Sequence, residues 1–194
     1  MNLKGLSFTN DWTLFLDRDG VINRRIPDGY VTRWEEFEFL DGVPEALRIL
    51  SEIFGRIIIV SNQQGIGKGI MTTDQLIGLD ARMREEIRKA GGWIDASYYS
   101  PHLEKDDHPD RKPAPGMGLK AKADFPEIDF TRSIMVGDTT SDIEFGKNLG
   151  MMTVCIGPEK ISADHNFDSL LDFANAINVN SKFHPPAGGP NSRK

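Results

Sequence analysis

The sequence alternates short apolar runs with amphipathic segments, and this alternation limits the fold more than any other feature. The run "RIIIVSN" (56–62) has four consecutive β-branched apolar residues, which is typical of a strand covered on both faces. The segment 72–92 carries leucine, methionine and isoleucine at helical spacing, and Thr72 and Gln75 have the spacing of a capping box. Alternating units of this kind predict an α/β protein with a parallel, doubly wound sheet.

Four more strands and four more helices complete the predicted pattern. The strands are expected at 12–17, 93–100, 132–138 and 151–157, and the helices at 42–53, 116–125, 141–150 and 168–177. Asp41 is the expected N-cap of the helix 42–53. We therefore expect one three-layer, Rossmann-like domain over residues 1–178 and a flexible tail over residues 179–194, which are rich in Pro, Gly, Ser and Asn.

The composition of the chain limits the kinds of binding partner and the cellular location that we expect for this protein. The net charge of -6 and the pI of about 5.2 argue against general nucleic-acid binding. Cys155 is the only cysteine, so no intramolecular disulfide can form, and no apolar segment has the length of a signal peptide or a transmembrane helix. We expect a cytoplasmic protein with no nucleic-acid partner and no membrane association.

Polar side chains cluster where the predicted strands end. In a parallel sheet, ligands bind beyond the carboxyl ends of the strands. The side chains expected there are Asp17, Asp19, Ser61, Asn62, Asp138 and Asp142, with Arg111 and Lys112 from a Pro-rich turn. Any one aspartate alone would be interpreted as a turn or cap residue. Gathered at one edge, the carboxylates need a cation such as Mg²⁺, and the remaining groups suit an anion, so the set predicts a phosphate site.

Four separated stretches carry a family resemblance. The stretches "DRDGVIN", "SNQQGIGKG", "RKPAPGM" and "VGDTTSD" resemble the four motifs of the haloacid dehalogenase (HAD) superfamily of phosphohydrolases. The sequence is most similar to the branch of D,D-heptose bisphosphate phosphatases and histidinol phosphatases, which "GYVTRWEEFEFLDGV" (29–43) also resembles. The resemblance implies a HAD-like fold without a large cap domain, and we expect a monomer.

The resemblance implies catalytic roles. Asp17 would be the nucleophile that forms an aspartyl-phosphate. Asp19 would protonate the leaving alcohol and then activate water as a base. Ser61 and Lys112 would hold the phosphoryl oxygens.

The resemblance also implies a Mg²⁺ site. Its ligands would be the carboxylates of Asp17 and Asp138 and the backbone carbonyl of Asp19, with Asp142 supporting them. Asn62 and Arg111 would contact the substrate. Further candidates near the mouth of the pocket are Arg18, Arg24 and Arg25, for which a solvated loop face is the alternative.

The sequence departs from the branch at two places. Many members carry a zinc loop with three cysteines and a histidine, but here Ser100, His108 and Asp110 stand where the cysteines would be, and His102 alone is kept. A Cys₃His site is therefore excluded, a weaker site from His102, His108 and Asp110 is the alternative, and we expect no zinc. Thr139 stands where heptose bisphosphate phosphatases commonly have lysine.

The expected function is that of a Mg²⁺-dependent phosphomonoesterase acting on a small phosphorylated metabolite. A sugar bisphosphate such as D-glycero-D-manno-heptose 1,7-bisphosphate is the first candidate, and histidinol phosphate or another sugar phosphate is the alternative. A non-catalytic phosphometabolite-binding protein would have a damaged catalytic set, whereas Asp17, Asp19, Lys112 and Asp138 are all present. A nucleic-acid 3′-phosphatase would need a basic groove, which the acidic balance disfavours.

Overall fold

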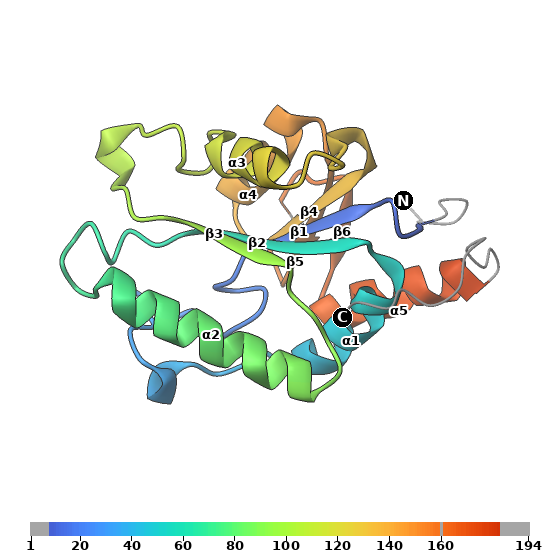
Figure 1. Ribbon diagram of the computed structural model, residues 1–194, viewed down its shortest axis with the longest axis horizontal. Coiled ribbons are helices and arrows are strands. Elements are labelled where there is room, and N and C mark those ends of the chain that lie inside the picture. The colour runs from blue at the N-terminus through green and yellow to red at the C-terminus, as the bar shows by residue number, and fades with distance from the viewer. Residues whose placement is uncertain (1–7, 160, 183–194) are drawn as a thin grey trace.

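A sheet of six parallel strands forms the centre of the computed structural model, which describes residues 8–159 and 161–182 (Figure 1). The strand order is β3-β2-β1-β4-β5-β6. The strands are β1 (Thr13–Leu16), β2 (Arg56–Asn62), β3 (Ala96–Ser100), β4 (Ser133–Gly137), β5 (Met152–Ile156) and β6 (His165–Phe167). The order reverses beside β1, which pairs with β2 on one side and β4 on the other. This topology confirms the predicted doubly wound α/β fold.

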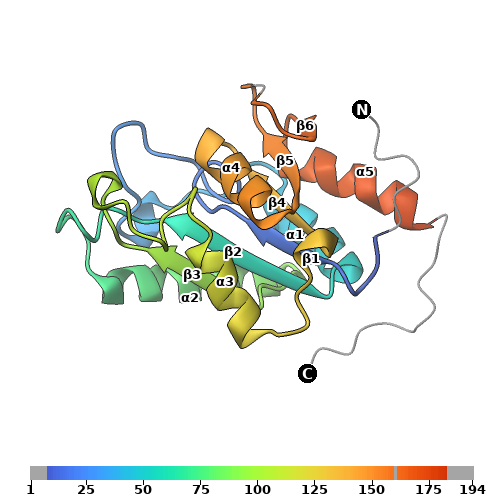
Figure 2. The same ribbon diagram turned by 90° about the horizontal axis from the view of Figure 1, so that it is seen from above.

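Helices cover both faces of the sheet. They are α1 (Val43–Ile53), α2 (Thr73–Lys89), α3 (Gly116–Asp124), α4 (Thr140–Leu149) and α5 (Leu170–Lys182). Short 3₁₀ helices span Trp34–Glu36, Glu104–Asp106 and Phe130–Arg132. Helices α3 and α4 lie on one face, and α1, α2 and α5 lie on the other (Figures 1 and 2). The result is the predicted three-layer arrangement.

Side chains of β1 alternate between two apolar cores. Leu14 and Leu16 point into the larger core, which is shared with α1, α2 and α5. Phe15 points into the smaller core with Met117 of α3 and Phe145 of α4. Successive residues of a strand face opposite sides, so a strand buried on both faces has to be apolar throughout. This burial holds the end of β1 in place, and the candidate site begins at the next residue.

Three details differ from the sequence-based expectation. Gly42, not Asp41, is the N-cap of α1, because the backbone there has φ 75°, a left-handed conformation that glycine adopts without strain. Strand β6 was not expected, since its three residues carry no apolar alternation. Helix α5 continues to Lys182, so residues 179–182 of the predicted tail are helical, while residues 183–194 lie outside the described residues.

The loops that follow the carboxyl ends of β1 and β2 are too short to form a separate domain. Residues 17–42, between β1 and α1, contain one 3₁₀ turn, and residues 63–72 link β2 to α2. The structure therefore agrees with the absence of a large cap domain between these elements. Across the described residues, every helix falls short of the length and apolar character that crossing a bilayer requires.

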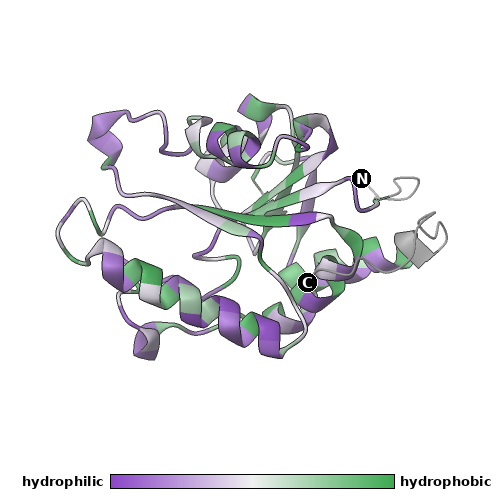
Figure 3. Ribbon diagram, viewed as in Figure 1, coloured by the Kyte–Doolittle hydropathy of each residue, from purple (hydrophilic) through white to green (hydrophobic). Residues whose placement is uncertain are grey.

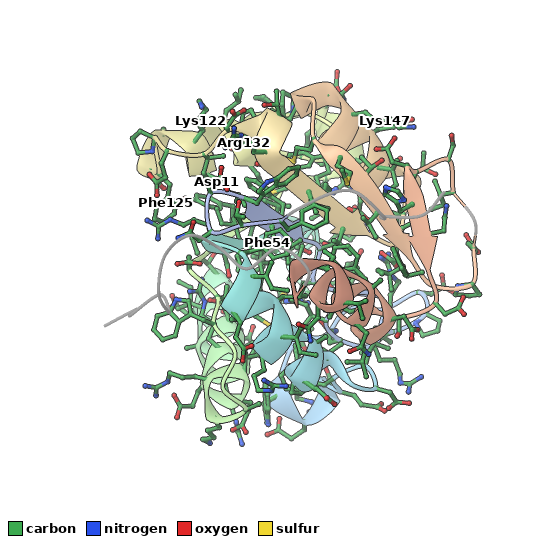
Figure 4. The ribbon with its side chains drawn as sticks, turned by 90° about the vertical axis from the view of Figure 1, so that its right-hand side faces the viewer. Asp11, Phe54, Lys122, Phe125, Arg132 and Lys147 are labelled. Atoms are coloured by element: carbon green, nitrogen blue, oxygen red, sulfur yellow. The ribbon has the colours of Figure 1, made fainter. Side chains whose placement is uncertain are left out.

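The amino ends of the strands form the opposite edge of the sheet. Arg132 and Asp11, both labelled in Figure 4, precede β4 and β1 and form an ion pair. Thr13 and Ser133 are register partners, so the two charged residues meet just before the paired strands begin. The candidate site lies at the other edge, where the same strands end.

Helix α2 is amphipathic as predicted, and its capping box between Thr72 and Gln75 is confirmed. Hydrophilic and hydrophobic residues alternate along it in Figure 3. Leu79 is 4% exposed in the larger core, whereas Ile77 is 60% exposed.

We expect Leu79→Ala to lower the free energy of unfolding by about 2–5 kcal/mol, because it removes buried methyl groups and leaves a cavity. Ile77→Ala, on the same helix, should change it by about 0.5 kcal/mol or less. Urea denaturation followed by circular dichroism measures both changes. Equal losses in the two variants would contradict the packing described for α2.

Candidate active site

A cavity of about 660 Å³ lies at the carboxyl ends of β1 and β2 and the start of α4. Most of the residues predicted from the strand ends line it: Asp17, Asp19, Ser61, Asn62, Arg111, Lys112 and Asp142. The structure thus brings together side chains that are up to 125 residues apart in the chain. Open α/β sheets bind ligands at such points, where the strand order reverses.

Lys112 joins two of the predicted carboxylates. Its Nζ donates to Asp17 Oδ1 at 2.9 Å and to the backbone carbonyl oxygen of Val60 at 2.7 Å, and it lies 2.5 Å from Asp142 Oδ1. Burial alone would lower the pKa of Lys112, but the charges of Asp142 and Asp17 outweigh it and raise that pKa. Lys112 therefore stays charged. Burial also raises the pKa of Asp17, although the Lys112 charge opposes this shift.

Besides its ion pair with Lys112, Asp142 accepts hydrogen bonds at the start of α4. Its Oδ2 accepts hydrogen bonds from the backbone amides of Asp138 and Thr139, at 3.2 and 3.0 Å, and from the Thr139 hydroxyl at 2.6 Å. Thr139 is the N-cap of the helix, so the residue that replaces the expected lysine forms a capping box with Asp142. Asp142 thus orients Lys112 and caps the helix at once, which fits the supporting role predicted for it.

Asp19 is surrounded by donors. Arg18 Nη2 lies 2.9 Å from both carboxylate oxygens, Asn23 Nδ2 donates to Oδ1 at 2.9 Å, and Gln63 Nε2 donates to Oδ2 at 2.7 Å. Burial favours a higher pKa for Asp19, but the Arg18 charge and these hydrogen bonds outweigh it and lower the pKa. The side chain is therefore held in one orientation as a carboxylate.

Arg18 differs from its expected role. Its side chain is 1% exposed, pairs with Asp19 and is not among the residues that line the cavity. In this position the Arg18 side chain orients Asp19 and does not face the cavity, and its contact with the substrate stays a prediction. Arg24 follows the solvent-exposed alternative, since it pairs with the exposed Glu38.

Three consecutive side chains at the carboxyl end of β2 form part of the wall of the cavity. Asn62 exchanges two hydrogen bonds of 3.0 Å with the backbone of Lys112, so it positions that lysine in addition to lining the cavity. Gln63 bridges Asp19 and the hydroxyl of Ser61, which accepts at 3.2 Å. Sequence reasoning did not single out Gln63, although it lies within a quoted motif. Ser61 is buried and lines the cavity.

Asp138 follows β4 and faces Arg25. Arg25 Nη2 donates to its two carboxylate oxygens at 2.8 and 3.0 Å. Burial and the nearby Asp17 charge raise the pKa of Asp138 to about 7, despite the opposing charge of Arg25. A Cβ at Gly20 would lie 1.9 Å from Asp138 Oδ2, so glycine is required where the chain after β1 passes this carboxylate.

These groups fit a divalent metal such as Mg²⁺. Asp17, Asp138 and Asp142 each offer a carboxylate oxygen, and these atoms lie within 4.8 Å of one another. Mg²⁺ prefers oxygen ligands, and a cation here would stabilise the charged form of Asp138, whose pKa is raised to about 7 by burial and by the Asp17 charge. Both oxygens of Asp142 are engaged by buried Lys112 and by the start of α4. The oxygens of Asp138 are engaged only by the half-exposed Arg25, so Asp17 and Asp138 are the carboxylates suited to hold the ion.

A second cluster lies in the loop that replaces the zinc loop of the branch. Ligand atoms of His102, His108 and Asp110 lie within 4.8 Å of one another, and the two imidazole rings are stacked. Asp110 also pairs with Lys120, and its backbone amide donates to Nδ1 of His108 at 3.1 Å. The loop is thus held by contacts within the chain, and the absence of zinc stays a prediction. Arg111 donates to the His102 carbonyl at 3.1 Å and lines the cavity beside the loop.

Known proteins resemble both the sequence and the fold. A family model described as HAD-hydrolase-like matches residues 110–169. A D-glycero-alpha-D-manno-heptose-1,7-bisphosphate 7-phosphatase of Mycobacterium tuberculosis is 35% identical over 175 residues, which cover 87% of this chain and 92% of the relative. A D-glycero-beta-D-manno-heptose-1,7-bisphosphate 7-phosphatase of Yersinia pestis is 33% identical over 189 residues, covering 87% and 96%.

A solved structure agrees with this at the level of fold. The D,D-heptose 1,7-bisphosphate phosphatase of B. bronchiseptica, described as complexed with magnesium and phosphate, has a TM-score of 0.78 and 24% identity. The similarity covers 86% of this chain and 97% of that one. At this identity the likeness supports the fold.

We expect Lys112→Met to lower the free energy of unfolding by about 3–5 kcal/mol at pH 7.5, because it leaves two buried carboxylates without their cation. The variant should recover part of this loss at pH 5. Loss of the lysine charge raises the already elevated pKa of Asp17 further, so the folded variant binds a proton that the unfolded chain, with a pKa near 3.8, releases.

Urea denaturation of the wild type and the variant at both pH values measures this difference. Lys120→Met, which removes an exposed lysine, is the matched control and should change stability little at either pH. A deficit in Lys112→Met that stays the same at pH 5 and 7.5 would contradict the ion pair described above.

Proposed function

This chain belongs to the HAD superfamily of phosphatases, in the branch of the heptose bisphosphate phosphatases, and from this premise we propose its substrate and its catalytic residues. The proposed reaction is Mg²⁺-dependent removal of the 7-phosphate from D-glycero-D-manno-heptose 1,7-bisphosphate. The observation that carries the proposal is the Asp17 carboxylate, held by buried Lys112 beside Asp19 in one cavity. The Asp17 carboxylate therefore has a fixed orientation toward a substrate bound in the cavity.

Asp17 is the proposed nucleophile. A bond forms between a carboxylate oxygen of Asp17 and phosphorus as the bond from phosphorus to the sugar oxygen breaks. Lys112 holds Oδ1 and offsets charge around the transferring group, which is how protein groups contribute most in phosphoryl transfer. Ser61 is proposed to donate its hydroxyl proton to a phosphoryl oxygen.

Asp19 is the proposed acid and base. It gives a proton to the leaving sugar oxygen, and it then takes one from the water that attacks the aspartyl-phosphate, which frees phosphate and Asp17. The donors around Asp19 lower its pKa, so the resting side chain is a carboxylate, which is the form that accepts a proton as a base. The arriving phosphate brings negative charge, which favours the protonated form that acts as the acid.

The proposed Mg²⁺ ligands are the Asp17 and Asp138 carboxylates and the backbone carbonyl of Asp19. When bound, the ion would supply positive charge that offsets the charge of the phosphoryl group. The carboxylate pair and the raised pKa of Asp138 support this assignment.

A bisphosphate suits the cavity better than a monophosphate. The cavity has a volume of about 660 Å³, which lies within the range of small-molecule sites. Lys68 and Arg111 line it and add cationic groups to that of Lys112. Lys68 Nζ lies 5.3 Å from the ring centre of Tyr30, which also lines the cavity. These cations could pair with a phosphate that is not being removed. We also propose that the protein acts in the cytoplasm as a single-domain monomer.

Phosphate release should be highest with a heptose 1,7-bisphosphate when the two anomers, histidinol phosphate and several sugar monophosphates are compared. EDTA should abolish the activity, and Asp17→Asn should lower it by about 10³-fold or more. Circular dichroism checks that the variant is folded. Full activity in Asp17→Asn would overturn the proposed nucleophile, and a preference for histidinol phosphate would support the alternative substrate.

The acid and base roles of Asp19 can be separated by the leaving group. Asp19→Asn should slow the first turnover of a sugar phosphate by about 10²–10⁴-fold, because an alkoxide needs a proton to leave. Nitrophenolate leaves without one, so 4-nitrophenyl phosphate should give a burst of one equivalent, followed by slow release as the aspartyl-phosphate accumulates. Stopped-flow absorbance measures the burst, and Asp17→Asn, which should show none, is the control. An equal slowing of the first turnover with both substrates would rule out the acid role.

A further inference from the structure

Arg25 touches all the groups assigned to the metal. Its Nη2 donates to the backbone carbonyl of Asp19 at 2.8 Å and to both oxygens of Asp138 at 2.8 and 3.0 Å, and it lies 3.9 Å from Asp17 Oδ2. We propose that the Arg25 guanidinium is an internal competitor for Mg²⁺, so that the metal binds only when Arg25 leaves. This inference rests on the proposed function, because it uses the metal site assigned there.

Geometry makes the two occupants mutually exclusive. Oxygen ligands approach Mg²⁺ to about 2.0–2.1 Å, so an ion shared by these groups would take the space between them. Nη2 of Arg25 already lies within hydrogen-bond distance of the Asp19 carbonyl and the Asp138 carboxylate. A nitrogen that carries part of a permanent positive charge cannot share that space with a divalent cation.

The charges explain why a cation from the chain is placed there. Arg18 pairs with Asp19, and Lys112 lies between Asp17 and Asp142. Asp138 forms its ion pair with Arg25 at 2.8 Å, a shorter distance than the 3.9 Å between Arg25 and Asp17. Without Arg25 or a metal, Asp138 would face the neighbouring Asp17 carboxylate across a largely buried site, which is unfavourable. Arg25 therefore stabilises the metal-free protein.

Arg25 can leave without disturbing the core. Its side chain lines the cavity and is 48% exposed, whereas the side chains of Arg18 and Lys112 are buried. Long exposed side chains change rotamer readily, so displacement by a metal does not require the backbone to unfold. Metal binding breaks the ion pairs of Arg25, and the free energy that this costs lowers the apparent affinity of the protein for Mg²⁺.

Arg24 provides a matched control one residue away. Its Nε and Nη2 donate to Glu38 at 3.0 and 3.1 Å, and both side chains of this pair are exposed. Arg24→Gln and Arg25→Gln remove the same charge from neighbouring positions. The two variants therefore separate direct competition from a general change in the charge of the loop.

Isothermal titration of the substrate-free protein with Mg²⁺ tests the inference. We expect Arg25→Gln to bind Mg²⁺ at least about fivefold more tightly than the wild type, the lower end of typical coupling between two binding events. Arg24→Gln should bind within about twofold of the wild type. Equal or weaker binding by Arg25→Gln would overturn the inference, and so would equal tightening in both variants.

Thermal melting gives a second readout that needs neither substrate nor activity. Without metal, Arg25→Gln should melt below the wild type, because Asp138 has lost its ion pair. At saturating Mg²⁺ the two melting temperatures should converge, since Arg25 has left Asp138 in the wild type as well. A gap that persists at saturation would mean that Arg25 and the metal bind together, which overturns the inference. If none of the three proteins binds Mg²⁺, the proposed metal site fails, and the proposed function fails with it.

Discussion

The site depends on the buried ion pairs that the Lys112 ammonium forms with two carboxylates. The ammonium joins the end of β1, the end of β2 and the start of α4 through Asp17, the Val60 carbonyl and Asp142. A buried ion pair of this kind is not a strong argument for stability, because desolvation offsets much of the attraction. Its value here is orientation, since a lysine with three fixed acceptors leaves the Asp17 carboxylate little freedom to turn.

Asp19 and Asp138 are also paired with cationic side chains, but the two cations differ in how deeply they are buried. Arg18 is enclosed and holds Asp19 in a fixed position. Arg25 is half exposed and holds Asp138 across a space that a metal could take. The site thus contains two cations that are fixed in the interior, Lys112 and Arg18, and a half-exposed one, Arg25, which we propose is displaced by the metal. A cluster of acids can persist in a folded chain only if such partners offset its charge.

Much of the fold could be predicted because hydrophobic periodicity reports burial directly. Within residues 8–159 and 161–182, five of the six strands and all five α-helices appear near their predicted positions. Strand β6 was missed because its pairing with β5 depends on backbone contacts, which leave no pattern in three mostly polar residues. The N-cap of α1 was misplaced because an acidic residue before a helix is usually the better cap, whereas here the chain enters the helix through a left-handed glycine.

The sequence by itself determined which residues meet at the site. Residues that follow buried parallel strands must gather at one edge of the sheet, so Asp17, Ser61 and Asp138 could be grouped without coordinates. The tertiary structure alone decided the partner of each group. Arg18, Arg24 and Arg25 are chemically alike and close in sequence, yet one is buried, one faces solvent and one reaches the carboxylate of Asp138. Their separation depends on how the loop after β1 folds back over the sheet edge, and no local pattern of residue types encodes that path.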